Sequence, residues 1–109
     1  MNPTILSHRF LAEMYGDAYF PDALVDRVRQ VLLDLSAQIE ANLPPDTAAL
    51  LVLTHAATEQ INALQLVFEQ HGSEIETVAR DCIGMDFDFV ARTHGFDVDC
   101  ENLIAPREW

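Results

Sequence analysis

The sequence contains no lysine, only two cysteines and no long apolar run. Six arginines oppose 18 acidic residues, which gives a formal net charge of −12 at pH 7. A surface of this charge repels nucleic acid and anionic membranes. The longest apolar run, Ala48 to Leu53, is too short to span a bilayer. We therefore expect neither a nucleic-acid-binding protein nor a membrane protein.

The compartment is predicted from two further absences. The amino terminus, MNPTILSHRF, has neither the cationic start nor the long apolar stretch of a secretory signal. Cys82 and Cys100 lack the spacing of a metal or redox site, and in a reducing compartment they are expected to be small buried side chains. These features predict a cytoplasmic protein.

Half of the 109 residues are hydrophobic, which suffices for a single domain over residues 1–109 with its own core. Helix-breaking residues divide the chain into segments of helical length. They are Gly16, Pro21, Pro44, Pro45, Gly72 and Gly95.

Three long helices are predicted, over residues 21–43, from a cap at Asp46 or Thr47 to about residue 70, and over residues 74–94. Short connections between them require antiparallel neighbours. Ser73 and Glu76 match a capping box before the third helix. A short amino-terminal helix over residues 7–15 and a carboxy-terminal helical turn complete the prediction. The expected fold is an all-α, small antiparallel helical bundle.

Apolar residues recur at three- and four-residue spacing in each long helix. The second helix is apolar around more than half its circumference, so it is predicted to be the central element. The predicted buried residues of the first helix are Leu24, Val28, Val31, Leu32, Leu35, Ile39 and Leu43. Those of the third helix are Ile75, Val78, Ala79, Cys82, Ile83, Phe89 and Val90, with Met85 at one margin.

A histidine and a carboxylate four residues apart, His55 and Glu59, share one face of the second helix with Asn62. Two ligands are too few for a transition metal, and no zinc-protease signature is present. This polar cluster lies opposite the core stripe, flanked by Thr58, so the pattern favours a solvated face over a metal site. No metal and no cofactor are predicted.

Asp86 occupies a position that the helical pattern of the third helix reserves for a buried residue. A buried carboxylate has to be paired, hydrogen-bonded or protonated. The candidate partners are Arg9, the hydroxyl of Tyr15 or Tyr19, and backbone amides of the aromatic turn over residues 14–22. The favoured interpretation is a structural hydrogen bond that holds the amino-terminal segment on the bundle, and the alternative is a catalytic acid or base.

The phrases MYGDAYFPDALVD, LTHAATEQIN, SEIETVARDCIGMDF and the terminal REW resemble a family of short, acidic bacterial proteins catalogued as a domain of unknown function. The resemblance covers residues 10–109. It implies a single-domain bacterial protein, and it carries over no catalytic residue, ligand or substrate.

Two classes of function therefore remain open. The preferred hypothesis is a protein-binding module for a basic partner, because the net charge is strongly negative and no nucleophile motif is present. The alternative is a metal-binding protein or a metal-dependent hydrolase-like enzyme that uses His55 and Glu59. A homodimer is compatible with both, through Leu51 and Leu66, and Trp109 is expected either to pack on the bundle or to serve as an exposed anchor.

Overall fold

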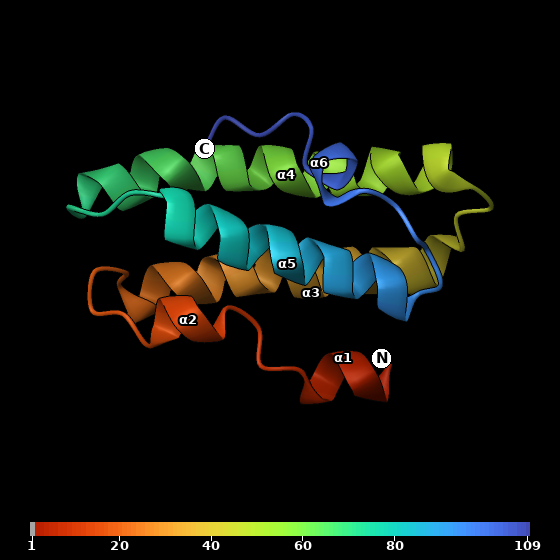
Figure 1. Cartoon of the computed structure of the whole chain (residues 1–109), viewed down its shortest axis with the longest axis horizontal. Helices are drawn as coiled ribbons and strands as arrows, with labels where there is room; N and C mark the ends of the chain where they lie inside the picture. Colours follow the sequence, from red (N-terminus) through yellow and green to blue (C-terminus); the bar gives the residue numbers. More distant parts are fainter. Residues whose placement is uncertain (1) are drawn as a thin grey trace.

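The computed structural model describes residues 2–109, and the elements within this range are helices joined by turns and loops. In chain order they are α1 (Pro3–Ser7), α2 (Ala12–Tyr15), α3 (Asp22–Asn42), α4 (Thr47–Gln70), α5 (Thr77–Thr93) and α6 (Cys100–Leu103). The three long helices α3, α4 and α5 form the body, and α4 runs antiparallel to the other two (Figure 1). The predicted all-α bundle is confirmed.

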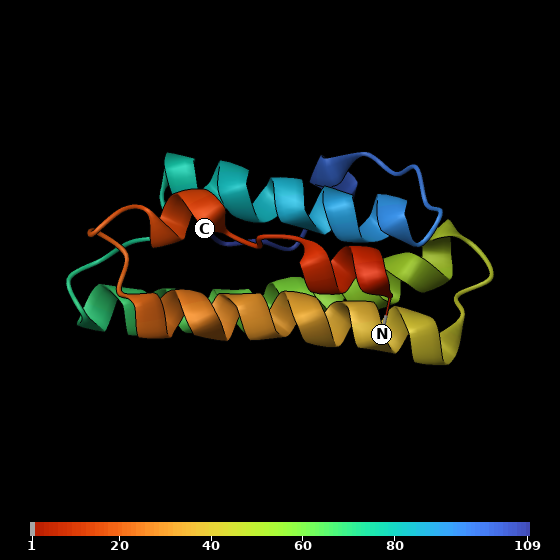
Figure 2. The same cartoon turned by 90° about the horizontal axis from the view of Figure 1, so that it is seen from below.

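The short segments at the two ends of the chain close the gaps between the long helices. The segment that carries α1 and α2 lies along α5 and also contacts α3, as the two views show (Figures 1 and 2). On the other side, α6 packs against both α5 and α4. The prediction that the second long helix is central is therefore wrong, because α5 has more of the other elements packed around it. The additional apolar surface of α4 includes Val52 and Leu66, which are exposed.

The first long helix buries the predicted stripe with one exception. Leu24, Val28, Val31, Leu32, Leu35 and Ile39 are all buried. Leu43 is 76% exposed, because α3 ends at Asn42 and Leu43 follows with a φ of 47°. This left-handed conformation turns the chain toward Pro44 and away from the stripe.

The α4 and α5 helices begin differently. Asp46 caps α4 as predicted, since its Oδ1 accepts a hydrogen bond from the Ala49 amide at 2.8 Å. The predicted capping box before the third helix is wrong. The helix begins at Thr77 rather than Glu74, and Glu76 precedes it without a side-chain cap.

Ser73 takes part in the carboxy-terminal end of the preceding helix, α4. Gly72 has a φ of 76°, and the Ser73 amide donates to the Phe68 carbonyl at 2.9 Å. This bond closes α4 with a Schellman motif. The Ser73 Oγ is buried and has no hydrogen-bond partner in the described residues. The backbone geometry set by Gly72 therefore prevents Ser73 from capping α5.

The buried face of α5 is rotated relative to the prediction. Val78 and Met85 are 48% and 70% exposed, whereas Phe87 is fully buried. This rotation of the buried face arises because α6 also packs against α5, at Gly84. A Cβ at that position would lie 3.2 Å from the Cys100 Sγ. Gly84 thus permits close packing of the carboxy-terminal segment.

Among residues 2–109, none of the helices combines the length and the apolar character that crossing a bilayer requires.

Candidate functional site

Asp86 is buried, with 7% of its surface exposed, and both of its carboxylate oxygens are engaged. Oδ1 lies 2.8 Å from the Nε2 of His8, and Oδ2 accepts a hydrogen bond from the Leu11 amide at 2.7 Å. A carboxylate oxygen accepts hydrogen bonds, so pairing with the Asp86 carboxylate requires a form of His8 that carries a proton on Nε2. Asp86 therefore binds the amino-terminal segment at two points.

The partners expected from the sequence for this carboxylate are wrong. Tyr15 donates its hydroxyl hydrogen to Asp26 instead. Arg9 and Tyr19 make no hydrogen bond to Asp86 in the described residues, and the amide that does so, from Leu11, precedes the aromatic turn. The prediction of a continuous helix over residues 7–15 excluded the Leu11 amide as a partner, because that amide would be hydrogen-bonded within the helix.

The amino-terminal segment leaves the helical conformation between α1 and α2. Leu11 has a φ of 56° and a ψ of 33°, which costs a residue with a side chain about 1–2 kcal/mol. The charge-assisted bond to Asp86 offsets this cost, and the Leu11 side chain is 1% exposed in the core. The predicted single helix is therefore replaced by two short helices with a bound loop between them.

His8 is held on three sides. Its ring stacks on Phe89 with the centroids 3.8 Å apart and 15° between the planes, and it meets the Phe10 ring edge-on at 4.6 Å. Asp86 fixes its Nε2. The side chain is nevertheless 26% exposed, so one part of a rigidly placed imidazole faces outward.

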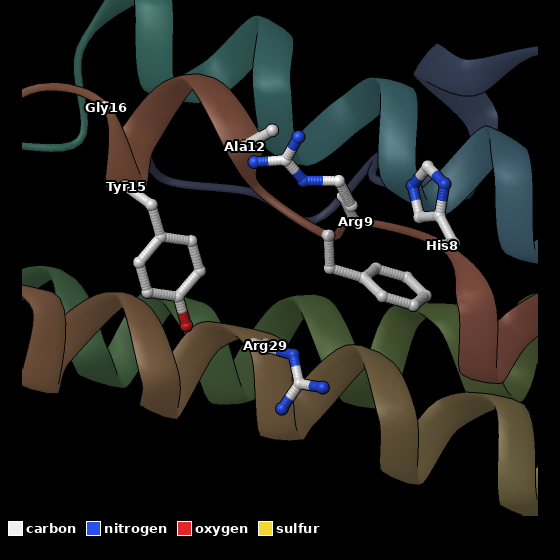
Figure 3. A pocket seen from close by; sticks show the side chains of 7 residues that line it. His8, Arg9, Ala12, Tyr15, Gly16 and Arg29 are labelled. Atoms are coloured by element: carbon white, nitrogen blue, oxygen red, sulfur yellow. The ribbon is translucent and has the colours of Figure 1, made fainter.

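A cavity of about 460 Å³ adjoins this pair. It lies between the amino-terminal segment and α3 (Figure 3). The lining residues are His8, Arg9, Phe10, Ala12, Tyr15, Gly16 and Arg29. Arg9 comes from the loop before α2, and Arg29 comes from α3. Two arginines and a histidine thus line one hollow of a strongly acidic protein.

Neither Arg9 nor Arg29 forms an ion pair within the part of the chain that the structure describes. Arg92 pairs with Asp88 and Asp97, and Arg107 pairs with Glu101, whereas Arg27 and Arg80 likewise form no ion pair among the described residues. The guanidinium groups at the cavity are therefore not neutralised by a carboxylate of the described residues.

Tyr15 closes one side of the cavity as a neutral phenol. Burial, the hydrogen bond to Asp26 and the negative charge of that residue together raise its pKa to about 12, and burial contributes most. A group with this pKa does not act as a base near neutral pH. The cavity is suited to binding rather than to proton abstraction by Tyr15.

The predicted polar cluster on α4 is partly covered by the carboxy-terminal segment. His55 Nε2 lies 2.8 Å from the Asn102 carbonyl oxygen. Glu59 remains exposed, and one of its oxygens accepts a weak hydrogen bond from Asn62 at 3.4 Å. The face of α4 that the sequence assigns to water is therefore in part a contact surface inside the protein.

Asn62 makes the closest connections to this segment. Its Nδ2 donates to the Pro106 carbonyl at 3.0 Å, and its Oδ1 accepts from the Glu108 amide at 2.8 Å. Trp109 is 5% exposed, and its carbonyl accepts from the Arg80 Nε at 3.1 Å. Of the two expectations for Trp109, packing on the bundle is confirmed.

Thr58, expected beside this polar face in solvent, is fully buried. Its hydroxyl donates to the Thr54 carbonyl at 2.8 Å, which satisfies the group within the helix. A threonine at this spacing reads as polar in a helical pattern, although its methyl group packs like that of a valine. The apolar face of α4 is consequently wider than the sequence indicates.

Metal ligands do not gather at the polar cluster. Over residues 2–109, no three or more histidine, cysteine, aspartate or glutamate side chains lie together in a way that could hold a metal ion. His55 and Glu59 thus have no further ligand brought to them by the described fold.

The two cysteines are free. Burial raises the pKa of both thiols, so they are weak nucleophiles. Cys82 is buried as expected, whereas Cys100 is only half-buried and donates to the Gly84 carbonyl at 3.1 Å.

Sequence reasoning did not place His8, Arg9 and Arg29 at one cavity, and it named Arg9 only as a candidate partner of Asp86. His8 and Arg9 form the only adjacent pair of cationic residue types in the chain, which is a weak signal in an acidic sequence. That they line the same cavity as Arg29 depends on the loop that Asp86 holds.

A model of a family described as a family of unknown function (DUF5713) matches residues 4–109 of the chain. The match confirms the resemblance to a family of unknown function. Searches of curated proteins and of solved structures found no match.

Proposed function

The chain belongs to DUF5713, a family of unknown function, and we propose that it is a single-domain binding module for a basic protein partner. The support is its unneutralised charge. The formal net charge is −12, and few of the 18 acidic residues form ion pairs within residues 2–109. The paired ones are Asp86, Asp88, Asp97 and Glu101.

One end of the bundle carries the observation on which the proposal rests. The α2–α3 connection and the α4–α5 connection lie at the same end of the molecule (Figures 1 and 2). Tyr19 on the first connection is 41% exposed, and its ring packs edge-on against Phe20, with the centroids 5.2 Å apart. Partial burial raises the pKa of Tyr19, and the charges of Glu74 and Glu76 on the second connection raise it further.

A partly exposed aromatic ring at the same end of the molecule as exposed carboxylates is a surface that an arginine or lysine side chain recognises. The cation stacks on the ring face and pairs with the acidic groups. Tyrosine is also enriched among the residues that contribute most to protein interfaces. We define Tyr19, Glu74 and Glu76 as the acidic end, and we assign the basic partner to it.

The remaining charge acts at longer range. A protein with this net charge attracts a basic partner through the summed field, which raises the association rate and makes it fall with salt. The proposal places the protein in the cytoplasm and involves no nucleic acid. The alternative, a metal-dependent hydrolase-like enzyme using His55 and Glu59, gains no observation from the described residues.

The test is a pull-down from lysate at low and moderate salt, followed by affinity measurement with each purified basic protein that is retained. Tyr19→Ala and the pair Glu74→Gln with Glu76→Gln are each expected to weaken binding about tenfold or more. The matched control is Asp34→Asn with Asp81→Asn, which removes the same charge from exposed positions on α3 and α5.

Two outcomes would overturn the proposal. If no basic protein is retained at either salt concentration, the hypothesis of a basic protein partner is contradicted. If the control pair weakens binding equally, the assignment of the binding site to the acidic end is contradicted, because the affinity then depends on net charge alone. Light scattering at several concentrations tests a homodimer, for which Leu66, 59% exposed on α4, is an available apolar contact, whereas Leu51 is half-buried.

A further inference from the structure

We propose that the cavity beside His8 is a binding site for a small molecule that carries a carboxylate or phosphate group. The site comprises His8, Arg9, Tyr15 and Arg29. It is distinct from the acidic end, and its ligand has the opposite charge to the basic protein partner proposed above.

The distribution of positive charge carries the inference. The chain has six arginines against 18 acidic residues, and two of the six line this one cavity. Their guanidinium groups form no ion pair and no side-chain hydrogen bond with the described residues, although acidic residues are abundant. Each guanidinium presents five N–H donors in a planar fork that matches the oxygens of a carboxylate or phosphate.

Two of the carboxylates near the cavity are already engaged. Asp26 accepts the hydroxyl hydrogen of Tyr15. Asp86 is buried and uses Oδ1 for His8 and Oδ2 for the Leu11 amide. These two carboxylates therefore do not occupy the arginine donors, and an incoming anion that pairs with a guanidinium group gains charge-assisted hydrogen bonds.

The size and the walls of the cavity define the ligand further. A volume of about 460 Å³ is that of a site for a small organic molecule. The rings of His8 and Phe10 supply an apolar wall, and they are fixed against each other edge-on. The two arginines come from separate segments, the loop before α2 and the helix α3, and Figure 3 shows the Arg9 side chain directed toward Ala12 and away from Arg29. A ligand that contacts both arginines therefore connects the amino-terminal segment to the bundle.

The buried carboxylate acquires a role in this site. Asp86 holds His8 and Leu11, and these residues flank Arg9 and Phe10 in the loop that forms the wall. The cavity is consequently built before a ligand arrives, which reduces the ordering cost of binding. Asp86 is a positioning residue for the site.

The experiment is a titration of the full chain, labelled with nitrogen-15, with inorganic phosphate and separately with succinate, at constant ionic strength maintained with chloride. Saturable shifts are expected in the side-chain N–H signals of Arg9 and Arg29. Saturation by phosphate alone identifies a phosphate-bearing ligand, and saturation by succinate alone identifies a carboxylate. Saturation by both probes means that the site recognises the oxyanion that phosphate and carboxylate groups share.

Variants locate the site. Arg9→Gln and Arg29→Gln are each expected to weaken binding about tenfold or more, since a charge-assisted hydrogen-bonding group is lost. Arg27→Gln is the matched control, because Arg27 lies on the same helix, is exposed and does not line the cavity. It is expected to leave the affinity unchanged.

The absence of a saturable response to both probes overturns the inference. If Arg27→Gln weakens anion binding equally, the inference is also overturned, because the affinity then depends on the overall charge of the protein. Either result leaves the basic-partner proposal standing, since that proposal depends on Tyr19, Glu74 and Glu76.

Discussion

His8 and Asp86 are separated by 78 positions in the sequence, yet the His8 Nε2 lies 2.8 Å from the Asp86 Oδ1. The second carboxylate oxygen holds the Leu11 amide at 2.7 Å. One buried side chain thus fixes a loop that lacks regular hydrogen bonding of its own. The wall of the cavity is a consequence of this contact.

Replacement of Asp86 by alanine is expected to destabilise the protein by about 2–3 kcal/mol, because the buried Leu11 amide loses its acceptor. Asp86→Asn keeps an acceptor for that amide and is expected to cost less. Urea unfolding measures both changes. Asp88→Ala, on the same helix with an exposed Arg92 pair, is the control, with an expected cost below about 1 kcal/mol. Equal costs for Asp86→Ala and Asp88→Ala would show that Asp86 does not hold the loop.

Ser73→Ala is expected to leave stability unchanged or to raise it slightly. The Ser73 hydroxyl is buried without a partner among the described residues, so its removal eliminates an unsatisfied polar group. Asp46→Ala, which removes a true helix cap, is expected to cost about 1 kcal/mol. Thermal unfolding of the two variants compares them directly. A loss of about 1 kcal/mol in Ser73→Ala would instead support the capping box that the sequence indicates.

Asn62→Ala is expected to loosen the carboxy-terminal segment by about 1–2 kcal/mol, since its side chain bonds both Pro106 and Glu108. Trp109 is the only tryptophan and is buried, so its fluorescence reports the segment. We expect a red-shifted emission in Asn62→Ala and an additional early transition on heating. Gln60→Ala, exposed on the same helix, is expected to retain the original spectrum. An unchanged spectrum in Asn62→Ala would mean that contacts other than those of Asn62 hold the carboxy-terminal segment.

Gly84→Ala tests the close approach of α6. Alanine improves helix propensity by about 1 kcal/mol, but its Cβ would lie 3.2 Å from the Cys100 Sγ. The gain is therefore expected to be larger in a Cys100→Ala background than in the original chain. A double-mutant cycle from urea unfolding measures the difference. Additive effects would mean that the two residues do not constrain each other.

Alkaline pH is expected to weaken the fold through Tyr15. Its pKa is raised from 10.0 to about 12 in the folded protein, so the folded state favours the neutral phenol. The associated stability is fully present below pH 10 and is lost as the pH rises from 10 toward 12. Comparison of unfolding free energies between the original chain and Tyr15→Phe isolates this contribution. Asp26→Asn is expected to lower the Tyr15 pKa, which tyrosinate absorbance detects. Identical pH profiles for the original chain and Tyr15→Phe would contradict the expectation.

The sequence determined the helical class and most of the core, because apolar spacing along a helix depends only on the helix itself. The first long helix buries six of the seven residues expected, and the Asp46 cap forms as the local pattern predicts. The same periodicity marked Asp86 as a carboxylate on a buried face. Local rules are sufficient for these features.

Tertiary structure decided what these features contact. Asp86 meets His8 rather than Arg9, because Leu11 adopts a left-handed conformation that no local pattern specifies. The polar face at His55 is covered because the chain after α5 returns to α4. Helical periodicity identifies which side of a helix is apolar, whereas the partner of each side depends on long-range packing. That packing places Arg9 and Arg29 at one cavity, a proximity that the spacing of the two residues in the chain does not encode.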